Sequence, residues 1–186
     1  MAELPQIMDA NLPMSIDSQT VFPWLSLIVL LPIVGALIMP FLPTQESKNP
    51  NLPRNIALVI LLADFLIIVL SFANLFVPSS ESLQLVERLQ WLPSIGLEWS
   101  LGVDGISAPL VVLSGLITFL SAAASWKVKQ KTRLYFALLL IQASAQALVF
   151  LSQDFLLFFL AWELELVPVY LPVSYTHLTL PTIYSV

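Results

Sequence analysis

Two glutamates, Glu163 and Glu165, lie near the middle of the apolar segment Phe155–Leu171 (FLLFFLAWELELVPVYL). An ionised carboxylate at the centre of a bilayer costs roughly 2.5–3.5 kcal/mol, so such a group is first a hypothesis about proton or ion movement. Pro168 follows in the same segment and removes the helical hydrogen bond to the carbonyl of Leu164. We therefore interpret Glu163 as a candidate proton-transfer residue close to a helix kink at Pro168.

Glu163 and Glu165 are separated by two positions, which turns their side chains about 200° apart around a helix. They cannot both face one water-lined interior. We expect one to face a polar axis and the other to face a partner helix, another subunit or the membrane interface. The alternative is that both carboxyls are held protonated and only form hydrogen bonds between helices.

Asp64 lies near the centre of another apolar segment, where it must be paired, protonated or in contact with water. Every lysine and arginine lies outside the apolar segments, so the sequence offers Asp64 no ionic partner. Proton transfer and a role in packing or subunit contact both stay open for this residue. Gln142 and Gln146 lie one helical turn apart, and we favour hydrogen bonding between helices over a water relay for them.

The composition identifies a membrane protein. Of the 186 residues, 58% are hydrophobic and 10% are charged, and the mean hydropathy is +0.90, whereas soluble domains average about 25% charged residues. The sequence has no cysteine and one histidine, His177, which excludes disulfides, iron–sulfur ligation and multi-histidine sites. It also lacks a phosphate loop and a basic-aromatic patch. We expect this chain to bind no cofactor, metal or nucleic acid.

Five apolar segments have about the 20 residues needed to cross the hydrocarbon core. We expect helices at about Phe22–Leu42, Ile56–Val77, Ile106–Trp126, Leu134–Leu151 and from Phe155 onward. Two short aromatic runs, Leu85–Leu92 and Gly96–Val103, predict a β-hairpin on the membrane surface. The predicted fold is an all-α integral membrane protein with about five transmembrane helices and a hairpin between the second and third.

The basic residues indicate the orientation. Six of the seven lie in the loops between the first and second and between the third and fourth helices: Lys48, Arg54, Lys127, Lys129, Lys131 and Arg133. By the positive-inside rule this face is cytoplasmic or stromal. The N-terminal tail, residues 1–21, and the hairpin are then expected on the lumenal side.

The motif WELELVPVYL (Trp162–Leu171) resembles the antiporter-like membrane subunits of respiratory complex I, in particular the chain 4 family of cyanobacterial and plastid NAD(P)H–plastoquinone oxidoreductases. Three stretches support the resemblance: FPWLSLIVLLPIVGALIMPFLP, GLEWSLGVDGISAPL and QDFLLFFLAWELELVPVY. The likeness covers roughly Val21–Leu171. It implies that residues 22–171 form the N-terminal part of an antiporter-like transmembrane domain.

The resemblance implies a subunit in the membrane arm of a proton-pumping complex, with other membrane subunits and the lipid bilayer as partners. Electrons would pass from NAD(P)H or ferredoxin to plastoquinone in other subunits, so this chain would have no redox role of its own. The key glutamate of the family falls on Glu163, which would carry a proton reversibly beside a lysine on a later helix. Glu165 and Asp64 are further candidates. The implied location is the cyanobacterial thylakoid membrane.

The sequence leaves the family pattern after about Leu171. We expect residues 172–186, which include VSYTHLTLPTIYSV (Val173–Val186), to be an atypical tail of artefactual origin. The chain would then be a truncated N-terminal fragment that translocates no protons by itself. Two alternatives stay open: a subunit of a multi-chain cation/proton antiporter, and a structural membrane protein without transport activity.

Overall fold

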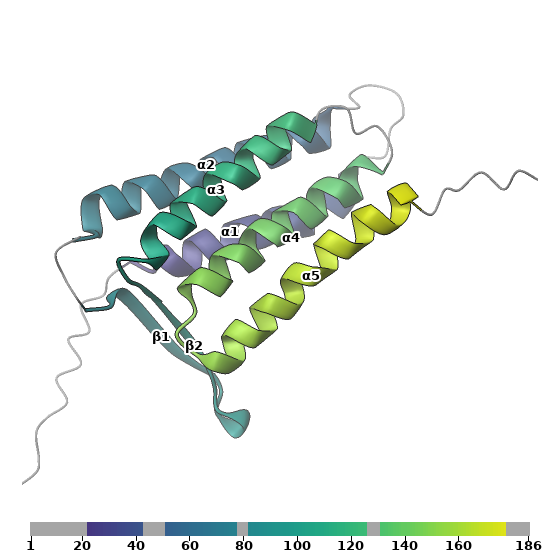
Figure 1. Cartoon of the computed structure of the whole chain (residues 1–186). Helices are drawn as coiled ribbons and strands as arrows, with labels where there is room; N and C mark the ends of the chain where they lie inside the picture. The colour runs from purple at the N-terminus through teal and green to yellow at the C-terminus, as the bar shows by residue number, and fades with distance from the viewer. Residues whose placement is uncertain (1–21, 43–50, 78–81, 126–130, 178–186) are drawn as a thin grey trace, which may run out of the picture.

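A computed structural model describes residues 22–42, 51–77, 82–125 and 131–177, with side chains as far as Pro168. Within these ranges the chain forms five α-helices and one β-hairpin, with a short 3₁₀ turn after the first helix and another between the strands (Figure 1). The elements are α1 (Trp24–Ile38), η1 (Met39–Phe41), α2 (Leu52–Leu75), β1 (Gln84–Leu92), η2 (Pro93–Ile95), β2 (Leu97–Val103), α3 (Ser107–Ala124), α4 (Thr132–Leu151) and α5 (Phe155–His177).

In the described part of the chain, four helices are long and apolar enough to cross a membrane: Trp24–Phe41, Leu52–Leu75, Ser107–Ala124 and Thr132–Leu151. They agree with the first four predicted spans. The fifth span, on α5, stays a prediction. Helix α5 continues to His177, so the first residues of the predicted tail are helical. The N-terminal tail, Lys48, Lys127, Lys129 and residues 178–186 lie outside the described residues.

Helix α4 is the centre of the bundle and contacts all four other helices. Helices α2 and α3 lie on one side of the α1/α4 pair and α5 on the other (Figure 1). Small side chains allow close approach: Gly35 of α1 faces Ile60 and Leu140 so closely that a Cβ would lie 2.7 Å from the Ile60 Cδ1 atom. Ser144 of α4 is buried and donates to the carbonyl oxygen of Val29 at 2.6 Å. This packing fixes α4 against α1.

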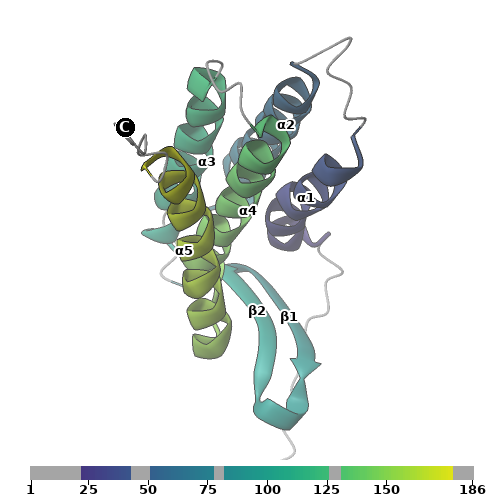
Figure 2. The same cartoon turned by 90° about the vertical axis from the view of Figure 1, so that its right-hand side faces the viewer.

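The hairpin lies at one end of the bundle, as Figure 2 shows. Strands β1 and β2 pair antiparallel, with Leu89 opposite Trp99. Gly96 turns the chain between the strands with φ = 72°, a left-handed conformation that glycine adopts without a steric penalty. The backbone N–H of Gln153 donates to the carbonyl oxygen of Ser100 at 2.8 Å. The hairpin predicted from the sequence is therefore confirmed, and it is joined to the turn between α4 and α5.

Acidic side chains cap two helices. Asp104 Oδ1 accepts from the backbone N–H groups of Ser107 at 2.6 Å and Ile106 at 3.0 Å, while Ser107 Oγ accepts from the Asp104 N–H at 3.0 Å. Asp154 Oδ1 accepts from the Leu157 N–H at 2.8 Å. Such caps satisfy N–H groups that have no partner within the helix. They fix where α3 and α5 leave the hairpin end of the bundle.

Candidate proton-transfer site

Glu163 lies in the middle of α5, and its side chain is exposed. Helix α5 packs on α4 and on β2. The neighbours of Glu163, Trp162 and Leu164, are exposed as well. The carboxyl group therefore projects from a surface that is otherwise apolar. At membrane depth such a group needs water or a polar partner, because hydrocarbon does not solvate a charge.

Glu165 faces a different part of the protein. It is half-buried, and its Oε1 accepts a hydrogen bond from Nε2 of Gln142 on α4 at 3.1 Å. The two glutamates thus have separate surroundings, as their rotation of about 200° on a helix predicts. The contact also confirms Gln142 as a residue that joins two helices. The Oε1 atom of Gln142 is buried and has no hydrogen-bond partner within the described ranges.

Asp64 is buried in α2, with 4% of its side chain exposed. Its Oδ1 and the Oγ of Ser71 are buried on the same helix without a hydrogen-bond partner among the described residues. Because α2 and α5 lie on opposite sides of the α1/α4 pair, the structure does not bring Asp64 to Glu163 (Figure 1). Its burial inside the bundle favours packing or a bound water over contact with another subunit.

Pro168 is buried and lies inside α5, which continues to His177. A proline inside a helix leaves a carbonyl oxygen one turn earlier without its donor. Here that carbonyl belongs to Leu164, next to Glu163 and Glu165. The kink at Pro168 stays a prediction. A carbonyl freed in this way would be an acceptor for water on the same helix as the two carboxyl groups.

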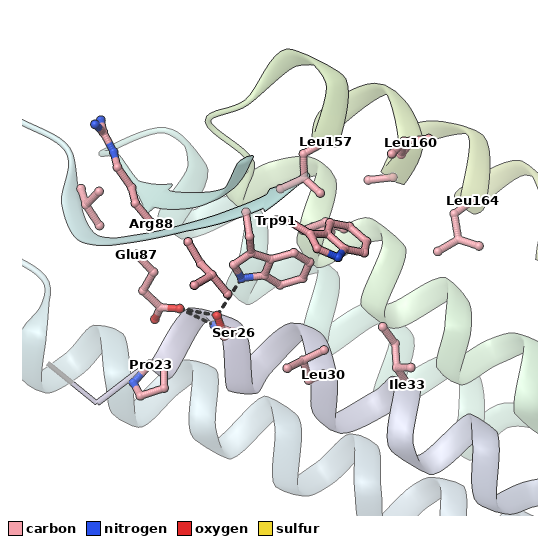
Figure 3. A pocket seen from close by; sticks show the side chains of 15 residues that line it. Pro23, Ser26, Leu30, Ile33, Glu87, Arg88, Trp91, Leu157, Leu160 and Leu164 are labelled. Carbon is pink, nitrogen blue, oxygen red and sulfur yellow. Dashed lines mark hydrogen bonds between the residues drawn. The ribbon is translucent and has the colours of Figure 1, made fainter. Parts of the chain in front are cut away.

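A cavity of about 740 Å³ lies between α1, the hairpin, α4 and α5 (Figure 3). Helix α5 contributes Leu157, Leu160 and Leu164 to its wall, and α1 contributes Leu30 and Ile33. Glu163 and Glu165 do not line it. An apolar lining of this kind fits hydrocarbon rather than a polar substrate.

The polar end of this cavity holds a hydrogen-bond network that sequence reasoning missed. Glu87 of β1 accepts from the N–H groups of Leu25 at 2.7 Å and Ser26 at 2.9 Å, and also from the Ser26 hydroxyl. Trp99 Nε1 donates to Ser26 Oγ at 2.9 Å (Figure 3). Glu87 therefore supplies α1 with the anionic cap that Pro23 cannot provide. The sequence feature that could have indicated this network was Glu87 itself, a charged residue in a strand whose partner strand is largely buried.

The described residues contain no group of three or more histidine, aspartate or glutamate side chains that could hold a metal ion. The carboxyl groups of Asp64, Glu87 and Glu165 instead lie on separate elements with separate surroundings.

Comparisons with known proteins identify relatives over most of the chain. The family described as "NADH-ubiquinone oxidoreductase chain 4, amino terminus" matches residues 19–152. NAD(P)H-quinone oxidoreductase chain 4 2 of Microcystis aeruginosa is 50% identical over 153 residues, which are 82% of this chain and 27% of that protein. NAD(P)H-quinone oxidoreductase chain 4 of Prochlorococcus marinus is 53% identical over 154 residues, or 82% and 28%.

Two solved structures share the fold. Respiratory complex I from Thermus thermophilus with bound NADH contains a chain with a TM-score of 0.64 and 25% identity; the match covers 79% of this chain and 28% of that one. The membrane-bound sulfane sulfur reductase, an archaeal respiratory membrane complex, contains one with a TM-score of 0.63 and 18% identity, covering 80% and 22%. The second likeness concerns the fold alone.

The matched residues include the first four helices and the hairpin, and the identity to the cyanobacterial relatives is about half. The chain spans 27–28% of the length of these relatives. The resemblance inferred from the WELEL motif is therefore confirmed, and the chain belongs to the NADH-ubiquinone oxidoreductase chain 4 family.

Proposed function

We propose that this chain is the N-terminal part of a membrane-arm subunit of a proton-pumping NAD(P)H- or ferredoxin-plastoquinone oxidoreductase. Its first helices would help to move protons, while electrons pass through other subunits of the complex. The chain itself would bind no redox cofactor. Its partners would be other membrane subunits and lipid, in the cyanobacterial thylakoid membrane. Family membership and a carboxyl group on an apolar helix surface support this proposal.

Glu163 would bind and release the transported proton. Its exposure on α5 is the observation that carries this role, because a carboxyl group on an apolar helix surface has no stabilising function within the described bundle. The basic partner expected from the family, a lysine on a later helix, would lie beyond the residues of this sequence. Glu165 would face α4 instead, and Asp64 would serve packing or bind water rather than carry the transported proton.

The comparisons favour the oxidoreductase over the two alternatives, since the curated relatives are named as its chain 4. The fragment would be inactive alone, because the relatives are far longer than the matched part. The test therefore uses the complete subunit in the assembled complex.

Replacement of Glu163 by glutamine removes the exchangeable proton and keeps the shape of the side chain. We expect Glu163→Gln to abolish the share of proton pumping per electron that passes through this subunit, with the complex still assembled. The measurement is acidification, in the dark, of the interior of sealed thylakoid vesicles whose cytoplasmic face is outward, normalised to electron transfer. Glu98→Gln, on the exposed side of β2, is the matched control and should pump normally. Normal pumping by Glu163→Gln would remove the proposed role.

A further inference from the structure

The contact between Glu165 and Gln142 is incomplete if Glu165 is ionised. Gln142 donates one hydrogen bond through Nε2, at 3.1 Å from Glu165 Oε1. Its own carbonyl oxygen, Oε1, is buried and receives no hydrogen bond within the described part of the chain. A carboxylate has only acceptors, so an ionised Glu165 leaves that oxygen unsatisfied. A buried acceptor without a donor is a specific cost of this arrangement.

A protonated Glu165 removes this mismatch. Its O–H can donate to Gln142 Oε1 while its carbonyl oxygen accepts from Gln142 Nε2, which closes a ring of two hydrogen bonds between acid and amide. The result does not depend on the orientation assigned to the amide. If Oε1 and Nε2 are exchanged, two oxygen atoms lie 3.1 Å apart, and a proton must again lie between them.

The one cation among the described residues of the elements that pack on α5 is Arg133 of α4, which lies nine positions before Gln142, about 13 Å along the helix. Among the described residues, the ionisable side chains on the elements that pack on α5 are Arg133 and Tyr135 of α4 and Glu98 of β2. The backbone of Tyr135 lies about 10 Å from that of Gln142 along the axis of α4. The Tyr135 hydroxyl is hydrogen-bonded to the Ser125 hydroxyl at 2.7 Å. Glu163 lies on the other side of α5.

From this geometry we infer that Glu165 is a neutral acid that anchors α5 to Gln142, and that it positions Glu163 without carrying the transported proton. The acid–amide ring fixes the rotation of α5 about its axis. Because Glu163 is about 200° away on the same helix, a fixed Glu165 holds Glu163 on the opposite surface. Glu165 is thus a positioning residue, and this role rests on the proposed function of Glu163.

Three variants of the complete subunit in the assembled complex test the inference. Glu165→Gln keeps two hydrogen bonds to Gln142 as an amide–amide ring but has no exchangeable proton. We expect it to pump within about twofold of the unmodified complex. Glu165→Leu should lower the amount of assembled, pumping complex by roughly fivefold or more, since it leaves Gln142 unpaired. The exchanged pair Gln142→Glu with Glu165→Gln restores the ring and should rescue both quantities.

Infrared spectroscopy gives a readout that packing alone would not move. In difference spectra against the unmodified complex, Glu165→Gln should show the loss of one carbonyl band of a protonated carboxylic acid, and the exchanged pair should show no net loss of such a band. Pumping lost in Glu165→Gln would show that Glu165 carries the proton and would overturn the inference. Normal assembly of Glu165→Leu would overturn the anchor. Glu163→Gln separates the two proposals, because its normal pumping refutes the proposed function whatever the Glu165 variants do.

Discussion

Glu87 holds the start of α1 against the hairpin. Its two carboxylate oxygens accept hydrogen bonds from two backbone N–H groups and one hydroxyl of α1. These bonds join Glu87 to Ser26 and Leu25, which lie 61 and 62 positions earlier in the sequence. The first N–H groups of a helix have no partner within it, so removal of the carboxylate leaves Leu25 and Ser26 with unsatisfied donors. Glu87 is therefore a structural residue, distinct from the carboxyl groups proposed to bind protons.

We predict that Glu87→Ala destabilises the complete subunit by about 1–3 kcal/mol, the cost of leaving buried donors unpaired. The measurement is thermal unfolding in lipid nanodiscs. Glu98→Ala removes an exposed carboxylate from the paired strand and should change the free energy of unfolding by less than about 0.5 kcal/mol. Equal effects of the two substitutions would show that the cap contributes nothing.

The separation of Glu163 from Glu165 could be predicted from the sequence, because two positions on a helix fix the angle between them. Which glutamate faces α4 could not. That assignment depends on how α5 is rotated against α4, and Gln142 is 23 positions away in the sequence. Nor does a local pattern indicate that Glu87 meets Ser26, since the two residues lie on a strand and on a helix that only tertiary packing brings together.

At the scale of elements, long apolar runs predicted the helices well, because each span has about the length that a bilayer requires. The start of α2 differs from the prediction by four residues: the helix begins at Leu52, whereas the predicted segment begins at Ile56. Pro53 occupies the first turn, where its missing N–H costs nothing and its fixed φ suits the helix. The prediction located helices by runs of apolar residues, and it missed this turn because Arg54 and Asn55 are polar.

The junction between the hairpin and α3 should respond to acid. The backbone hydrogen bond from Ser107, supported by that from Ile106, lowers the pKa of Asp104 below its usual value of 3.8. Since the folded pKa is the lower one, the stabilisation is complete above the unfolded value and is lost as the pH falls from about 4 through the folded pKa.

We therefore predict that the difference in unfolding free energy between the unmodified subunit and Asp104→Asn is constant near neutral pH and shrinks below about pH 4. Thermal unfolding across a pH series measures it. Gly105→Ala, a substitution in open space at the next position, should show no such pH dependence. A difference that grows as the pH falls would contradict the role of the cap.

At the scale of the whole molecule, the two ends of the bundle differ. The hairpin and the turn between α4 and α5 occupy one end (Figure 2). The other end holds the starts of α2 and α4, with Arg54, Lys131 and Arg133. Because successive helices run in opposite directions, these basic residues lie at the same end of the bundle. The predicted orientation requires this arrangement. The described structure thus supports a polarised bundle, and the lumenal side of the hairpin stays a prediction.

Single cysteines can test this orientation, since the sequence itself has none. Ser94→Cys marks the exposed tip of the hairpin, and Asn55→Cys marks an exposed position at the basic end. In sealed vesicles with the cytoplasmic face outward, a membrane-impermeant maleimide should label Asn55→Cys at once and Ser94→Cys only after permeabilisation. The positive-inside rule predicts this order, because moving the basic end across the membrane opposes the bias that sets topology. Labelling of both sites from the outside would mean that the hairpin and the basic end share one face, and the spans could not then cross the bilayer in alternation.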